Sequence, residues 1–156
     1  MDVERIKKIF PSYFENFRLP EAAIEQEIEV YRACKTRKIE RESFLNSYEE
    51  NGFKIPPDCD KNDPQQYSLS TYFRLNDIKR FVTIDSQYNP PFVLAKGHTT
   101  ADDGRSCKSK DWKKCKNSHV DWWLYVGAEP WRAFEETTYE HEKELKSIPT
   151  TESSAV

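Results

Sequence analysis

Residues 118–125 read Ser-His-Val-Asp-Trp-Trp-Leu-Tyr, the most strand-like stretch of the chain. β-branched and aromatic residues alternate here with polar ones, which predicts a strand over 118–126. Successive side chains of a strand point to opposite faces of its sheet. One face therefore carries Val120, Trp122 and Leu124, and the other carries His119, Asp121, Trp123 and Tyr125. The first face is typical of core. The second is either an open pocket for a nucleotide or a sugar, or a filled face holding a satisfied polar pair.

The rest of the chain has the composition of one well-solvated domain. It has 156 residues, of which 37% are hydrophobic, 13% aromatic and 33% charged, with a net charge of −3. A chain of this length can bury a real core, and its charge argues against a globally basic nucleic-acid binder. We expect a single α+β domain over 1–146 and a disordered tail over 147–156. No signal-like or membrane-spanning run is found, so we expect a cytoplasmic protein without membrane association.

Hydrophobic periodicity places the remaining elements. Further strands are expected near 28–34, 67–72 and 92–98, forming with 118–126 a small, mostly antiparallel sheet. The segment 28–34 also fits a helix almost as well, and 99–117 is expected to be a long polar loop. Helices are expected near 40–50, 76–82 and 129–137.

The segment 105–117 concentrates positive charge. It holds six basic residues against the single acid Asp111, with one tryptophan in the middle. Cations beside an aromatic ring can bind phosphates and stack on a base, or they can dock on an acidic protein. The competing interpretation is a solvated hairpin tip. The candidate partner-binding residues are Arg105, Lys108, Lys110, Trp112, Lys113, Lys114 and Lys116.

Two histidines lie near acids. His119 and Asp121 share a strand face, and His98 ends the expected preceding strand. If those two strands pair, all three side chains meet as a metal site or an acid–base pair. His119 and Asp121 are therefore the candidate catalytic residues. No complete set of metal ligands can be assigned. The competing interpretation is a hydrogen-bonded pair on the sheet.

An arginine near the end of an early strand, a later Ser-x-Ser-Thr strand and a still later acid form a third pattern. Arg32, the run Ser68-Leu69-Ser70-Thr71 and Asp121 follow one another in this order. The arrangement resembles that of ADP-ribosyltransferases. The resemblance implies NAD as a cofactor, with Arg32 on its phosphates, Ser70 and Thr71 lining the pocket, and Asp121 in the place of the family's glutamate. The chain as a whole also resembles small proteins of Gram-positive gut bacteria and of their mobile elements, which implies no activity.

These observations favour one function over two others. We expect an intracellular binding or accessory protein that recognises a nucleic acid or a protein through the 105–117 loop and the aromatic strand face. The alternatives are an ADP-ribosyltransferase-like enzyme or a metal-dependent hydrolase using His98, His119 and Asp121. Candidate ligand-binding residues are Arg32, Ser70, Thr71, Trp123 and Tyr125.

Overall fold

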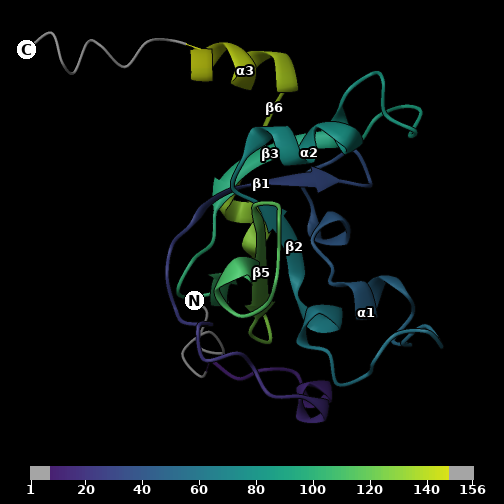
Figure 1. Cartoon of the computed structure of the whole chain (residues 1–156), viewed down its shortest axis with the longest axis vertical. Helices are drawn as coiled ribbons and strands as arrows, with labels where there is room; N and C mark the ends of the chain where they lie inside the picture. Colours follow the sequence, from purple (N-terminus) through teal and green to yellow (C-terminus); the bar gives the residue numbers. More distant parts are fainter. Residues whose placement is uncertain (1–7, 148–156) are drawn as a thin grey trace, which may run out of the picture.

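A computed structural model describes residues 8–147 as a single sheet with helices packed on it (Figure 1). The strands are β1 (Glu29–Cys34), β2 (Leu69–Tyr72), β3 (Val93–His98), β4 (Gly104–Lys108), β5 (His119–Leu124) and β6 (Phe134–Thr137). The helices are α1 (Ser47–Glu50), α2 (Leu75–Val82) and α3 (Tyr139–Ser147), and short 3-10 turns include η3 (Arg41–Ser43), η4 (Pro64–Tyr67), η5 (Ser109–Asp111) and η6 (Pro130–Ala133). The α+β class is confirmed. Of the tail expected over 147–156, all but Ser147 lies outside the described residues.

The sheet is antiparallel and has the strand order β4-β5-β2-β1-β3-β6. β5 lies between β4 and β2, with Trp122 opposite Leu69 and Asp121 opposite Ser70. The predicted strand is therefore real and internal to the sheet. The segment 28–34 is also a strand, since all of β1 pairs with β3.

The sheet bends sharply between β1 and β2. The register of this pair consists of Tyr31 opposite Tyr72, and Figure 1 shows β1 and β3 running crosswise to β2 and β5. The side chain of Arg32 spans this bend. Its guanidinium donates to the carbonyl oxygen of Ser70 at 2.8 Å and to that of Ser43 at 3.0 Å. Arg32 thus links β1 to β2 beside the short stretch over which the two strands pair.

Each face of the sheet is covered. The bend brings β6 back over the face of Val120 and Trp122, where Phe134 and Phe44 complete the core cluster. On the opposite face, α2 packs on β1 and β2 through Leu75 and Ile78. The predicted division of β5 into a core face and a second face is therefore correct.

The helix expected over 40–50 forms only in its last turn. Asn46 caps the start of α1: its side chain accepts from the backbone N–H of Glu49 at 2.8 Å, and the Glu49 carboxylate accepts from the backbone N–H of Asn46 at 3.0 Å. Upstream, the carbonyl oxygens that would continue a helix bind Arg32 instead, because Ser43 and Leu45 accept from its guanidinium. A tertiary contact overrides the local helical pattern.

The prediction of a helix over 129–137 is wrong. Residues 130–133 form the 3-10 turn η6, and β6 then pairs with β3 at the edge of the sheet. The pairing depends on Gly97, opposite Phe134. A Cβ at Gly97 would lie 2.2 Å from the carbonyl oxygen of Ala133 and 2.6 Å from the Phe134 ring. The helix expected near 76–82 is confirmed as α2.

The polar segment 99–117 is not all loop. Its first half contains β4, which pairs with β5 along its whole length and closes a hairpin through η5. Arg105 and Lys108 therefore belong to a strand, and the true connection is 109–118. All four cysteines are free thiols, with Cys34 and Cys107 buried.

The helices between residues 8 and 147 are all too short or too polar to span a lipid bilayer.

Candidate functional site

Asp121 is the centre of a buried polar cluster. Its side chain has 0% of its surface exposed. Its carboxylate accepts from four side chains, each brought by a turn or a strand end. These are Ser68 Oγ at 2.7 Å, Ser109 Oγ at 2.7 Å, Trp112 Nε1 at 3.1 Å, and Gln65 Nε2 at 3.2 Å from both oxygens. Buried charge is tolerated only where donors replace the lost water, and here they do so.

Ser109 links this carboxylate to His119. Its Oγ lies 2.7 Å from Asp121 Oδ2 and 2.5 Å from His119 Nδ1. The hydroxyl has one hydrogen and the carboxylate can only accept, so Ser109 donates to Asp121 and accepts from Nδ1–H of His119. Serine thus lies between histidine and aspartate. In a nucleophilic triad the histidine takes that place, and Ser109 is fully buried besides. Through one carboxylate, the cluster links side chains from two separate turns to β5.

The pKa of His119 is lowered by burial, although the neighbouring Asp121 opposes the shift. The folded protein therefore binds a proton at this site less readily than the unfolded chain does. Below the unfolded histidine pKa of about 6.5, the unfolded state gains protons and the fold loses stability. We expect the free energy of unfolding to fall between about pH 7 and pH 5. Urea unfolding at a series of pH values measures this effect. In a His119→Gln variant, the free energy of unfolding should fall less steeply as the pH is lowered. An equal dependence on pH in the variant and the native protein would contradict the assignment.

The second face of β5 is filled, so the open-pocket alternative does not hold. Trp123 has 0% of its surface exposed and donates from Nε1 to the carbonyl oxygen of Pro64 at 2.9 Å. Tyr125 is buried, and its hydroxyl donates to Glu25 at 2.6 Å. Both residues act in packing, with an aromatic cluster of the N-terminal segment above them.

His98 does not meet His119. Its strand, β3, is separated from β5 by β1 and β2, so the strand pairing on which that hypothesis depended is absent from the described sheet. His98 Nδ1 lies 3.0 Å from the carbonyl oxygen of Thr99. Within residues 8–147, no three histidine, cysteine or acidic side chains are grouped closely enough to hold a metal ion.

The residues of the transferase-like pattern are divided between two places. Arg32 and Ser70 border a cavity of about 210 Å³ at the bend of the sheet. Thr71 is fully buried in the core, and its hydroxyl donates to the carbonyl oxygen of Val120 at 3.2 Å. Asp121 is enclosed by its own donors. Burial lowers the pKa of Arg32, and Glu50 opposes that shift.

Three cations gather around Phe73, the residue that follows β2. Lys108 Nζ lies 4.6 Å from the ring centroid, the Arg74 guanidinium carbon 5.3 Å and Lys110 Nζ 5.6 Å. Phe73 is half-buried, while Arg74 and Lys110 are exposed. We call these four residues the Phe73 surface. The sequence pointed to the two lysines, but Phe73 and Arg74 come from another segment and were missed.

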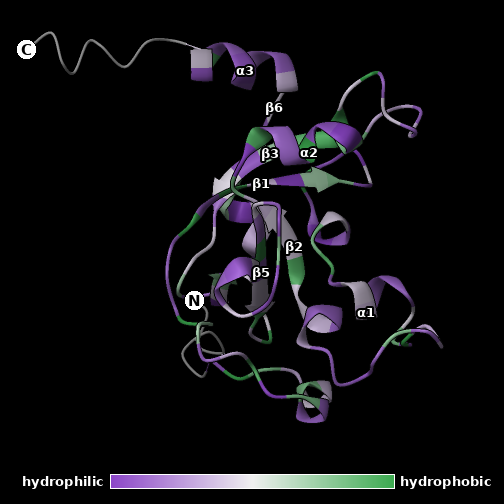
Figure 2. Ribbon diagram, viewed as in Figure 1, coloured by the Kyte–Doolittle hydropathy of each residue, from purple (hydrophilic) through white to green (hydrophobic). Residues whose placement is uncertain are grey.

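The other basic residues differ from these in their surroundings. Lys113 donates to Gln65 Oε1 at 2.7 Å and lies 5.3 Å from the Trp112 ring. Lys114 and Lys116 are exposed in the same connection. Arg105 lies at the far end of β4, opposite Trp123. Figure 2 shows the connection after β4 as mostly hydrophilic where it passes in front of β5.

Trp112 fixes this connection rather than offering a free ring. Its indole nitrogen is bound to Asp121, and its ring packs 6.3 Å from that of Trp123. Ser109 is held by the same carboxylate. The loop that carries the lysines is therefore tied to the core at two points.

Comparisons with protein-family models, with curated proteins and with solved structures find no match for this chain.

Proposed function

We propose that this protein binds single-stranded nucleic acid through the Phe73 surface and the lysines of residues 113–116, which follow Lys110 in the same hairpin connection. The observation that carries the proposal is the convergence of Arg74, Lys108 and Lys110 on one half-buried aromatic ring. Like charges held this close repel one another, and a bound phosphate relieves the repulsion. Aromatic rings beside cations are the usual means of holding an unpaired strand, because every base has a face that can stack.

The hairpin supports this role because it is ordered before any partner arrives. Ser109 and Trp112 bind the Asp121 carboxylate at 2.7 and 3.1 Å. A loop fixed in this way loses little conformational freedom when it binds, so less of the interaction energy is spent on ordering. The buried cluster at Asp121 would then serve binding indirectly, as the support of the loop.

Acidic residues limit the surface on one side. Glu27, Glu29 and Asp111 border a hollow next to Lys108 and Lys110. They repel phosphates there, so the strand is expected to leave Phe73 towards residues 113–116 instead. The net charge of −3 fits such a local patch, with weak affinity away from it.

The test compares two triple variants of equal charge. One changes Arg74, Lys108 and Lys110 to glutamine. The other changes Lys38, Lys54 and Lys143, which are exposed elsewhere on the surface, to glutamine. Fluorescence anisotropy with labelled oligothymidine and oligouridine gives the affinities. Each lost phosphate contact on a single strand weakens binding about fivefold at ~0.1 M salt, so the first triple should bind about a hundredfold more weakly than the native protein. The second should bind as the native protein does.

Two results would overturn the proposal. One is equal affinity of the two triple variants. The other is binding of poly-glutamate without binding of either oligonucleotide, which would identify an acidic protein as the partner.

A second candidate, the transferase-like enzyme, has one observation in its favour: Arg32 and Ser70 border the same cavity. Two observations count against it. The Arg32 guanidinium already donates to backbone carbonyl oxygens, and Asp121 is fully buried. A thermal-shift titration with NAD tests it. A rise in melting temperature that Ser70→Val abolishes would support it, and no rise would remove it.

A further inference from the structure

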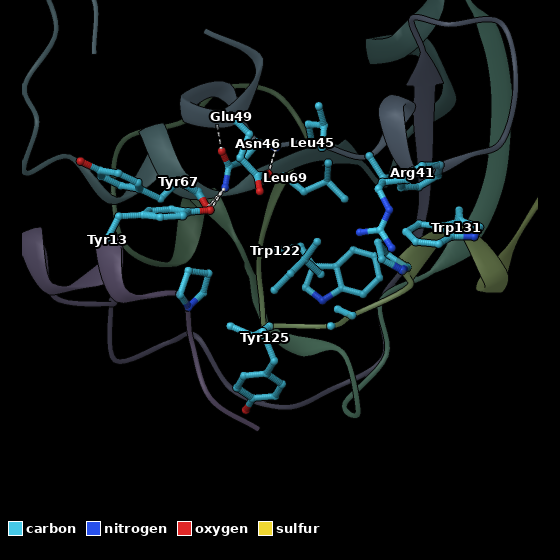
Figure 3. Close-up of a pocket in the computed structure, with 17 residues that line it drawn as sticks. Tyr13, Arg41, Leu45, Asn46, Glu49, Tyr67, Leu69, Trp122, Tyr125 and Trp131 are labelled. Atoms are coloured by element: carbon cyan, nitrogen blue, oxygen red, sulfur yellow. Dashed lines mark hydrogen bonds between the residues drawn. The ribbon is translucent and has the colours of Figure 1, made fainter. Parts of the chain in front are cut away.

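We propose that a cavity on the Trp122 face of the sheet binds a small aromatic carboxylate. The cavity has a volume of about 270 Å³ and lies between the sheet, the segment 41–49 and the turn after β5 (Figure 3). This is near the lower end of the usual range for small-molecule sites, roughly 300–1,000 Å³. The cavity lies on the opposite face of β5 from the Asp121 cluster, so it is independent of the proposed nucleic-acid site.

An unpaired donor in the lining points to a ligand. Trp122 lines the cavity and has 0% of its surface exposed, yet its indole Nε1–H has no hydrogen-bond partner among the described residues. The indoles of Trp112 and Trp123 are both paired, with Asp121 and with the carbonyl oxygen of Pro64. Buried polar groups are nearly always satisfied. The missing acceptor is therefore best supplied by a molecule in the cavity.

Arg41 indicates that the acceptor is negatively charged. In Figure 3 its guanidinium lies between the indoles of Trp122 and Trp131, and its central carbon is 5.0 Å from the centroid of the Trp131 ring. The carboxylate in the lining, Glu49, is already engaged, because it accepts from the Asn46 amide at 3.0 Å. A cation and a free N–H beside an occupied acid favour an anionic acceptor, and guanidinium matches a carboxylate well.

The apolar side chains of the lining determine which uncharged part of a ligand fits the cavity. Leu124, Val126 and Trp131 line the cavity with apolar side chains that are not fully buried, and the buried Trp122 ring lies across its middle. A flat ring stacks on such surfaces and buries its apolar area there. The lining therefore fits a molecule with one aromatic ring and one carboxylate, the size of benzoate or phenylacetate.

The test follows the indole N–H signals of the full chain by two-dimensional NMR during titration with benzoate, phenylacetate and, as a cationic control, benzylamine. The two acids should shift the Trp122 indole proton downfield as it gains an acceptor. The Trp123 signal should stay in place and serve as an internal reference, because Trp123 does not line the cavity and its Nε1 is already bound to the carbonyl oxygen of Pro64. Benzylamine should leave Trp122 unchanged.

Two variants locate the contacts. Arg41→Gln, at an exposed position, should weaken binding of both acids about tenfold through loss of a charge-assisted hydrogen bond. Trp122→Phe should weaken binding to a similar extent, because it removes the N–H group but keeps an aromatic ring at this position. If Trp122→Phe does not fold, the result for Arg41→Gln decides the test. The proposal is overturned if neither acid moves the Trp122 signal, if benzylamine moves it equally, or if Arg41→Gln binds as the native protein does.

Discussion

Exchange of Asp121 for asparagine is expected to lower the free energy of unfolding by about 3 kcal/mol. The carboxylate has donors on both oxygens: Ser68 on Oδ1, Ser109 and Trp112 on Oδ2. An amide offers one oxygen, so whichever way it is turned, its NH₂ group faces donors at a position that is not exposed to solvent. Unsatisfied buried groups cost about 1–3 kcal/mol each, which makes this a large effect for an isosteric change.

Urea unfolding of Asp121→Asn measures this effect, and Asp111→Asn is its control. Asp111 is an exposed acid of the same hairpin, so its substitution should change stability by less than about 0.5 kcal/mol. The native slope of unfolding against urea should be retained in both. Equal stability of the two variants would mean that Asp121 is not a structural anchor, and a chemical role for it would then have to be reconsidered.

Exchange of Arg32 for methionine is the second large effect, with an expected loss of about 3–5 kcal/mol. The guanidinium satisfies the carbonyl oxygens of Ser43 and Ser70 at the point where β1 and β2 part. Glu50 lies 3.8 Å from it but keeps Lys35 as a closer partner, so the loss is expected to come from the two carbonyl oxygens left without a donor. Methionine is an apolar side chain of similar length, so the loss of stability measures the contribution of the polar contacts of Arg32.

Lys35→Met is the matched control for this variant, because Lys35 also pairs with Glu50, at 2.8 Å, but makes no bond to these carbonyls. Exposed ion pairs contribute about 0–1 kcal/mol, so this variant should stay close to the native protein in thermal unfolding. If Arg32→Met were no less stable than Lys35→Met, the bend of the sheet would not depend on the guanidinium.

Much of the fold could be predicted because its strands follow simple patterns. The alternation of residues 118–125 correctly predicts that Val120, Trp122 and Leu124 share a core face, but it does not predict that Trp123 is fully buried on the other face. β4 was missed because Gly104, Arg105 and Lys108 look like a polar loop, although an edge strand needs few apolar residues. β6 was mistaken for a helix because the spacing of Trp131 and Phe134 fits one. Its true state depends on Gly97, which is distant in sequence and leaves room for the Phe134 ring.

The candidate site shows the same limit. The sequence identified Asp121 and His119 but not what covers them, since the donors Gln65, Ser68 and Ser109 come from turns without a periodic pattern. The Phe73 surface is likewise assembled from two distant segments. Local patterns predict faces of strands well, whereas the filling of those faces depends on long-range contacts that one sequence does not display.

The central claim, that the Phe73 surface binds single-stranded nucleic acid, is tested most directly by a salt series. Affinity of the native protein for oligothymidine is measured over increasing salt concentration. The account predicts a straight line of log affinity against log salt with a slope of roughly −2 to −4, from about −0.7 for each phosphate contact. The variant lacking Arg74, Lys108 and Lys110 should lose about two units of slope. A slope near zero, or the same slope in both proteins, would contradict the account.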